Sequence, residues 1–342
     1  MLAGLRLAAQ VTAPLHVRRV LGNAELPATI TGLRLAGSRP PDFDGFWQAT
    51  LDELDQQDPE VEAVEVDRSA SCSLAEVGFR SLGGARIEGY LLRWNDGAPR
   101  PLLLHGHGYG DRYDVRWDWA EAGFHVAGVD VRGFGRSRSA LPEPSPYGWI
   151  LTGLSAPETS VLRGAVCDVV RLGEVASALL GDAVTGVVRQ GTSLAGGLAV
   201  MAEAQRPSAQ LLALAVPTFG WMEGRRMLAH AGSGAEVTGF LQLHPAVEED
   251  AMVVLRYFDT VNHAARVRAP SLVGVGRVDD VVPAPTVYAI VNALTAPCEV
   301  WHLPVSHSML PAEQLWRRFE SRWLQRGLSL ARAGSATAYD AG

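Results

Sequence analysis

The feature that most constrains this fold is a series of continuous apolar segments that alternate with helical ones. The apolar segments are "PLLLHGHG" (101–108), "HVAGVDVRGFG" (125–135), "AVTGVVRQG" (183–191), "QLLALAVP" (210–217), "APSLVGVG" (269–276) and "CEVWHLP" (298–304). Helical patterns separate several of them, at 115–124, at about 160–180 and at 193–204. Strands that are apolar on both faces and joined through helices form a parallel sheet with helices on both sides. The sequence therefore predicts an α/β fold with a mostly parallel, doubly wound sheet.

The residues before this series predict antiparallel structure. Three segments alternate or are rich in β-branched residues, "VEAVEVDRS" (61–69), "LAEVGFRSL" (74–82) and "ARIEGYLLRW" (85–94), and Gly83-Gly84 makes the last two a hairpin. Upstream of them, residues 40–57 have apolar side chains at helical spacing, with Asp42 or Asp44 as the cap.

The pattern also divides the chain. We expect an N-terminal arm at 1–38, extended with some short helix, a main domain at 39–330 and a C-terminal tail at 331–342. Between about 218 and 266 the strand–helix rhythm breaks into helices with Gly and Pro joints, directly after a sheet strand. We interpret this insertion as a helical cap near the active site.

Charge and cysteine content exclude several classes of protein. The formal net charge is −7 and Lys and Arg form no block, which argues against nucleic acid or an anionic membrane surface as the main partner. No apolar stretch reaches the roughly 18 residues that span a bilayer, and the first residues do not form a convincing secretory signal. The three cysteines are far apart and have no metal or redox spacing, so we expect a reducing compartment, the cytoplasm.

One hydroxyl stands at a strand-to-helix junction. In "GTSLA" (191–195), Ser193 follows an apolar strand and precedes a helix rich in small residues. Ligands of open parallel sheets bind beyond the carboxyl ends of the strands, and a sharp turn there exposes a nucleophile beside free N–H groups at a helix start. The sequence differs from Gly-x-Ser-x-Gly by one alanine. A turn needed only for packing is the alternative.

The partners of a nucleophilic serine are found in the order that this fold requires, acid and then histidine. Asp279 and Asp280 follow the strand at 269–276, and His307 follows the strand at 298–304. His302 is the rival histidine, but it falls inside its strand. A turn aspartate and a solvated histidine are the alternatives without function.

These motifs resemble the acetyl xylan esterases and cephalosporin C deacetylases, family 7 of the carbohydrate esterases, within the α/β-hydrolase fold. The resemblance spans about residues 40–325 and is closest in "VLRYFDTVNHAARVRAPSLVGVGRVDDVVPAPTVYAIVNAL" (254–294). The family's acid follows Gly-x-x, which identifies Asp279 rather than Asp280. The resemblance implies a catalytic triad of Ser193, Asp279 and His307, and it implies a homo-oligomer, a hexameric ring in family members.

The oxyanion hole is expected from two backbone N–H groups. The first belongs to Leu194, the residue after the nucleophile. The second lies in the loop after the "LLLHG" strand, and the resemblance to the family places it at His107. A His-x-His metal pair of His105 and His107 is the alternative, but the sequence provides no further ligands nearby. We expect no metal and no cofactor.

The residues around these motifs depart from the family. Arg132-Gly133-Phe134, Leu194 and Ser308 replace the family's Arg-Gly-Gln, the Gln after the nucleophile and the Glu after the histidine. Together with Trp149 and Trp221, Phe134 predicts an apolar substrate pocket. We interpret Arg132 as an ion-pair residue with a structural role.

The sequence therefore predicts a serine esterase that removes small acyl groups, acetyl above all, from a carbohydrate or another small-molecule alcohol through an acyl-enzyme. Two other hypotheses remain. One is a hydrolase-fold protein that has lost turnover and serves binding or assembly. The other is hydrolysis of a different bond by the same triad, because a fold does not fix a reaction.

Overall fold

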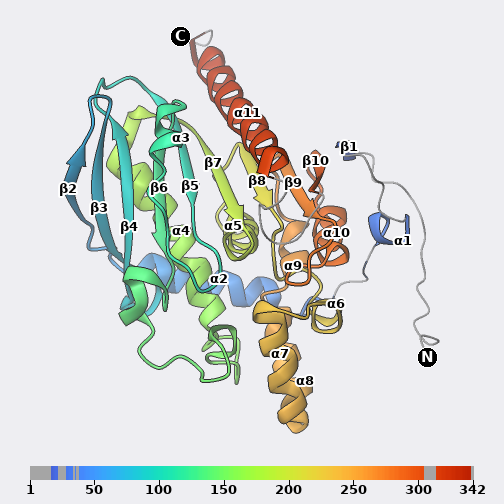
Figure 1. Cartoon of the computed structure of the whole chain (residues 1–342). Helices are drawn as coiled ribbons and strands as arrows, with labels where there is room; N and C mark the ends of the chain where they lie inside the picture. Colours follow the sequence, from blue (N-terminus) through green and yellow to red (C-terminus); the bar gives the residue numbers. More distant parts are fainter. Residues whose placement is uncertain (1–16, 22–27, 34, 36–37, 304–312, 340–342) are drawn as a thin grey trace.

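The computed structural model describes residues 17–21, 28–33, 35, 38–303 and 313–339. Within these residues one mixed sheet holds ten strands in the order β1–β10–β9–β8–β7–β5–β6–β4–β3–β2 (Figure 1). Their bounds are Val17–Leu21 (β1), Glu62–Arg68 (β2), Cys72–Arg80 (β3), Arg86–Trp94 (β4), Arg100–His105 (β5), His125–Asp130 (β6), Val184–Thr192 (β7), Leu211–Ala215 (β8), Ser271–Gly276 (β9) and Cys298–Leu303 (β10). Neighbours from β6 through to β1 are parallel, whereas β2, β3, β4 and β6 pair antiparallel. The predicted α/β-hydrolase architecture is confirmed.

Helices cover both faces of this sheet. They comprise Ala28–Thr31 (α1), Phe43–Gln56 (α2), Trp117–Glu121 (α3), Val161–Leu180 (α4), Leu194–Gln205 (α5), Met222–Leu228 (α6), Gly232–Leu243 (α7), Glu248–Arg256 (α8), Thr260–Ala264 (α9), Ala284–Ala293 (α10) and Glu313–Tyr339 (α11). Successive side chains of a strand point to opposite faces. Leu102 and Leu104 of β5 accordingly pack in the core that contains α4, whereas Leu103 packs in the core that contains α3 and α11.

Three local details differ from the sequence predictions or go beyond them. Helix α3 is shorter than the predicted 115–124 because Arg116 is not helical and Gly123, with φ 113°, ends the turn. Asp42 precedes α2 but makes no side-chain cap, since its carboxylate accepts a hydrogen bond from the hydroxyl of Tyr257 instead. Strand β1, within the predicted arm, pairs with β10 and extends the sheet.

Two further features are the connection between β8 and β9 and the length of the last helix. The chain returns from β8 to β9 through α6, α7, α8 and α9, and Figure 1 shows α7 and α8 extending away from the body of the protein. Helix α11 continues past residue 330, to Tyr339. Among the described residues, no helix is both long enough and apolar enough to cross a membrane.

A buried histidine joins three of these helices. The ring of His263, in α9, packs edge-on against Phe43 and Trp47 of α2, with centroids 4.9 and 5.1 Å away. Its Nε2–H donates to the carbonyl of Tyr257, and its Nδ1 accepts from the amide of Gln205 in α5, each over 3.0 Å. Burial lowers the pKa of His263 to about 3, so the folded protein holds this imidazole neutral.

This neutral histidine predicts a loss of stability in mild acid. Below about pH 6.5 the imidazole of His263 is protonated in the unfolded chain. In the folded chain it stays neutral down to about pH 3, so acid favours unfolding in this range. The contribution to the free energy of unfolding falls by up to about 1.36 kcal/mol per pH unit across that window. We expect urea denaturation between pH 7 and 4 to show a shallower pH dependence for His263→Gln than for the native chain. His230→Gln, at an exposed position, is the control and should keep the native dependence.

Candidate active site

Ser193 forms the turn between β7 and α5. Its backbone has φ 55° and ψ −114°, a left-handed conformation that non-glycine residues rarely adopt. The N–H of Ser193 donates to the carbonyl of Ala215 at the end of β8, over 2.9 Å, and its carbonyl accepts from Gly197 in the first turn of α5. The side chain is 6 % exposed. Ser193 therefore stands where the predicted strand–nucleophile–helix turn requires it.

Close packing explains the small residues around Ser193. A Cβ at Gly191 would overlap the backbone of Ala195 and Gly196, and a Cβ at Gly197 would lie 2.6 Å from the carbonyl oxygen of Thr218. Ala195, which replaces the last glycine of the motif, has its own Cβ beside Gly106, where an added Cβ would lie 3.2 Å away. The methyl group of Ala195 fits because the facing residue has no side chain.

The segment after β8 is strained and contacts this turn. Val216, Phe219 and Trp221 have positive φ angles of 41°, 67° and 52°. Between them, the N–H of Thr218 donates to the carbonyl of Ser193 over 3.2 Å. Such a backbone costs of order 1–3 kcal/mol at each residue and persists only where neighbouring contacts enforce it.

Asp259, which belongs to no sequence motif, holds much of this segment in place. Its carboxylate is 1 % exposed and accepts hydrogen bonds from the N–H groups of Trp221, Met222 and Val261, over 2.8–2.9 Å. Burial raises the pKa of this carboxyl to about 7. In its local sequence Asp259 is the N-cap of α9. Its hydrogen bonds with Trp221 and Met222 depend on residues 38 and 37 positions earlier, which only the fold brings close.

The two candidate acids after β9 have different environments. Asp279 is 9 % exposed, and its Oδ1 accepts from the N–H groups of Val281 and Val282 over 2.9 and 2.8 Å. Asp280 is exposed, and its carbonyl accepts from His230 and Ala231 in the cap. The two N–H donors fix the carboxylate of Asp279 at the end of β9, so this residue has the position of a buried orienting acid.

His307, the predicted catalytic base, lies outside the described residues. Its rival His302 lies in β10, is 4 % exposed, and its Nε2 is 2.5 Å from the hydroxyl of Tyr288. The expectation that His302 belongs to the sheet is therefore confirmed.

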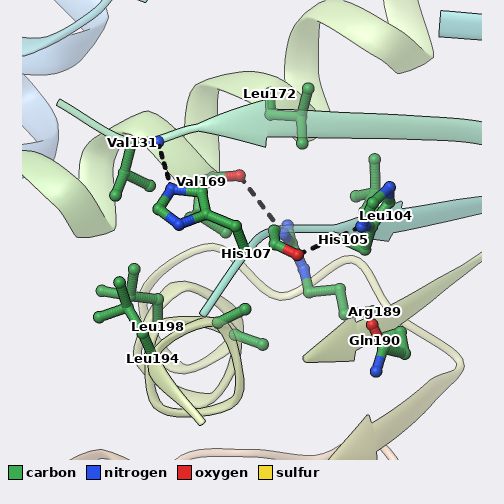
Figure 2. A pocket seen from close by; sticks show the side chains of 13 residues that line it. Leu104, His105, His107, Val131, Val169, Leu172, Arg189, Gln190, Leu194 and Leu198 are labelled. Carbon is green, nitrogen blue, oxygen red and sulfur yellow. Dashed lines mark hydrogen bonds between the residues drawn. The ribbon is translucent and has the colours of Figure 1, made fainter. Parts of the chain in front are cut away.

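The predicted oxyanion donors lie on facing segments. Gly106 packs against Ala195 at the start of α5, and His107 and Leu194 line the same pocket (Figure 2). Figure 2 shows the imidazole of His107 turned toward Val131, whose N–H donates to Nε2 over 3.2 Å, and its Nδ1–H donates to the carbonyl of Gly108 over 2.7 Å. In the part of the chain that the structure describes, the N–H groups of His107 and Leu194 donate to no acceptor. Both N–H groups can therefore bind an anion.

His105 and His107 do not face one another as metal ligands would. The Nε2 of His105 accepts from the hydroxyl of Tyr90 over 2.5 Å, and its Nδ1–H donates to the carbonyl of Gly106. Burial lowers the pKa of His105 to about 3. Within the described ranges, no group of three His, Cys, Asp or Glu side chains has an arrangement that could hold a metal ion.

The three predicted pocket residues occupy different positions. Phe134 is half-buried, and its ring lies 5.2 Å from the imidazole of His107 and 4.9 Å from the ring of Trp149. Trp149 is 7 % exposed and donates its indole N–H to the carbonyl of Arg132. Trp221 is half-buried at the start of α6, in the cap. Phe134 thus packs between His107 and Trp149.

Arg132 forms a buried ion pair, as expected from the sequence. Its guanidinium donates through Nε and Nη2 to the two carboxylate oxygens of Asp168 in α4, over 3.0 and 2.7 Å. The N–H of Arg132 donates to the same carboxylate. The pair holds the loop after β6 against α4.

The close packing around Ser193 predicts that a single added methyl group at Gly191 destabilises the protein. Gly191→Ala places a Cβ inside the backbone of α5, and such overpacking typically costs 1–3 kcal/mol or more, so we expect a loss of about that size in the free energy of unfolding. Gly45→Ala, in an exposed position of α2 with open space for its Cβ, should instead stabilise the protein by about 0.5–1 kcal/mol. Chemical denaturation of both variants tests this, and equal stability would contradict the packing described here.

Comparisons with known proteins agree with this architecture. The acetyl esterase Axe7A of Xylanibacter ruminicola is 24% identical over 302 residues, which cover 84% of this chain and 67% of that protein. Acetyl xylan esterase 1 from Thermoanaerobacterium sp. JW/SL YS485 superposes with a TM-score of 0.79 at 25% identity, covering 90% of this chain and 99% of the other. The acetyl xylan esterase from Paenibacillus sp. R4 gives a TM-score of 0.77 at 23% identity, with 86% and 99% covered.

The family model of the acetyl xylan esterases (AXE1) matches residues 27–319, most of the chain. That range contains β7, α5, β9 and β10, the elements that hold the candidate residues. The chain therefore belongs to the acetyl xylan esterase family and is a carboxylic ester hydrolase.

Proposed function

We propose that this protein removes acetyl groups from an acetylated carbohydrate or another small-molecule alcohol, with Ser193, His307 and Asp279 as its catalytic triad. The observation that carries the proposal is the backbone of Ser193, strained at a strand end beside two N–H groups that have no acceptor within the described residues. Strain of this kind is retained at functional sites. A turn serving only packing has no need to keep a serine there.

The reaction proceeds through an acyl-enzyme. His307 accepts the proton of Ser193 as its Oγ attacks the ester carbonyl, and Asp279 holds the imidazole in the required tautomer. The N–H groups of Leu194 and His107 stabilise the oxyanion of the tetrahedral intermediate, each contributing about 10²–10³ in rate. His307 then protonates the departing alcohol. In the second half, water attacks the acyl carbonyl as His307 takes its proton. The bond to Ser193 Oγ then breaks, the acid leaves, and His307 returns the proton to Ser193.

The substrate follows from relatives and from the walls of the site. The relatives carry the printed names acetyl esterase and acetyl xylan esterase. The apolar side chains of Leu194 and Phe134 beside the oxyanion donors favour a small acyl group and disfavour a strongly polar alcohol near the carbonyl. The names of the relatives make acetylated xylose the first candidate. The apolar side chains instead favour an acetyl ester of a less polar alcohol, and cephalosporin C is the second candidate.

We further propose that the enzyme works in the cytoplasm as a homo-oligomer with no nucleic-acid or membrane partner. Three buried cysteines, Cys72, Cys167 and Cys298, are unpaired. The net charge of −7 disfavours polyanions. The oligomer rests on the family resemblance, and analytical ultracentrifugation can measure it.

Replacing the nucleophile tests the reaction. Ser193→Ala should lower kcat on p-nitrophenyl acetate by at least about 10³-fold, because only the oxyanion hole and binding remain. Ser329→Ala, on an exposed face of α11, is the control. Acetate should be preferred over butyrate and octanoate. Equal rates for both variants would end the esterase proposal at this serine. A native chain without turnover would favour a binding protein, and strong activity on octanoate alone would oppose acetyl specificity.

The choice of acid has its own test. Asp279→Asn should lower kcat by about 10⁴-fold, since the amide orients the imidazole in the wrong tautomer. Asp280→Asn, at the exposed neighbour, should stay within about twofold of the native rate. Steady-state kinetics on p-nitrophenyl acetate measures both. The reverse ranking would move the role of the acid to Asp280.

A further inference from the structure

A hydrogen bond connects the cap with the loop that carries His107. Tyr109, two residues after His107, donates its hydroxyl to Oε2 of Glu236 in α7 over 2.5 Å. The same hydroxyl accepts from the N–H of Ile150 over 3.1 Å. Burial raises the pKa of Tyr109, and the phenol therefore stays protonated and able to donate.

Close packing on both sides fixes the positions of Tyr109 and Glu236. The ring of Tyr109 packs edge-on against Phe134 and Trp149, with centroids 5.6 and 5.8 Å away. The carboxylate of Glu236 lies against Gly148, where an added Cβ would overlap it. The loop after β5, the loop after β6 and the cap thus meet at one carboxylate.

Hydrogen bonds also connect the first turn of α7, through Arg225 and Thr218, with Ser193. Arg225, in α6, is 2 % exposed and donates through Nη2 to the hydroxyl of Ser233 and through Nε to the hydroxyl of Thr218, over 2.8 and 3.2 Å. The N–H of Thr218 donates to the carbonyl of Ser193. Burial lowers the pKa of Arg225 to about 10, while the charges of Glu236 and Asp259 favour its protonated form.

These contacts form one continuous path between the two predicted oxyanion donors. It runs from Ser193 through Thr218, Arg225 and Ser233 to α7, and from Glu236 of α7 through Tyr109 to the loop of His107. We propose that Glu236 and Tyr109 are positioning residues, which hold that loop to the cap and thereby set the spacing between the N–H groups of His107 and Leu194. This inference rests on the proposed function, because it assigns the two N–H groups to an oxyanion.

The test removes the hydrogen bond and keeps the ring. Tyr109→Phe should lower kcat on p-nitrophenyl acetate by about 10- to 100-fold with KM within about twofold, because a misplaced donor affects the transition state more than the bound ester. Glu236→Ala should match it, whereas Glu236→Gln, which keeps an acceptor, should retain at least about one third of the native kcat. The double variant Tyr109→Phe/Glu236→Ala should be no slower than either single variant.

A second readout separates positioning from general loosening. A trifluoromethyl ketone forms a tetrahedral adduct with the serine and places its oxyanion in the hole, so its inhibition constant should rise by the same factor by which kcat falls. Tyr113→Phe is the matched control on the same loop, because among the described residues its hydroxyl makes one long hydrogen bond, accepted from Arg136 over 3.5 Å. Glu249→Ala, exposed on α8, is the control for the cap.

The outcomes are distinct. Native kcat and a native inhibition constant in Tyr109→Phe, with Ser193→Ala inactive, would overturn the positioning role and leave the proposed function intact. Native activity in Ser193→Ala would instead remove the proposed function. If Tyr109→Phe does not fold, as judged by circular dichroism, Glu236→Asp makes the same test, since it keeps the charge and withdraws the carboxylate by one methylene. Native kinetics in Glu236→Asp would likewise overturn the inference.

Discussion

The left-handed backbone of Ser193 is the constraint on which the rest of the site depends. A residue with a side chain avoids this conformation, so the protein must hold it from several sides. The carbonyl of Ala215 fixes the N–H of Ser193, Gly197 and Thr218 fix its carbonyl, and the missing side chain of Gly191 lets the first turn of α5 approach. The parallel pairing of β7 with β8 places that carbonyl beside Ser193.

Buried charges hold the elements behind this turn. Arg189 of β7 and Glu203 of α5 are each 2 % exposed and pair over 3.1 Å, and the carboxylate also accepts from the N–H groups of Ser208 and Ala209. Breaking such a pair typically costs 3–5 kcal/mol, because the remaining charge has no compensation. The pair ties the nucleophile helix to its strand and to the connection that leads into β8. The turn at Ser193 is thereby supported by contacts that are buried from solvent.

The helices between β8 and β9 make hydrogen bonds with several parts of the candidate site. Asp259 accepts a hydrogen bond from the strained segment after β8. Arg225 donates to Thr218 in that segment and to Ser233 in α7, and so connects the two. Through Glu236 and Tyr109 the same helix reaches the loop of His107. Helices inserted between two strands are therefore connected by hydrogen bonds both to the loop that carries His107 and to the turn at Ser193.

The continuous apolar segments predicted the parallel strands β5 to β10, because strands buried on both faces must be apolar throughout. The glycines around Ser193 indicated the turn that exposes a hydroxyl at a strand end. Strand β1 carried no such signal. The sequence also indicated Asp279 and His307 as the candidate acid and base, because each follows a predicted strand and the acid precedes the histidine. Only the tertiary structure decided that Asp279 is held by two N–H groups while Asp280 is exposed, and that Asp168 pairs with Arg132. Tyr109 and Glu236, 127 residues apart, carried no local signal. Periodicity records which side of an element is buried, but the partner of a polar group depends on chain segments that only folding brings together.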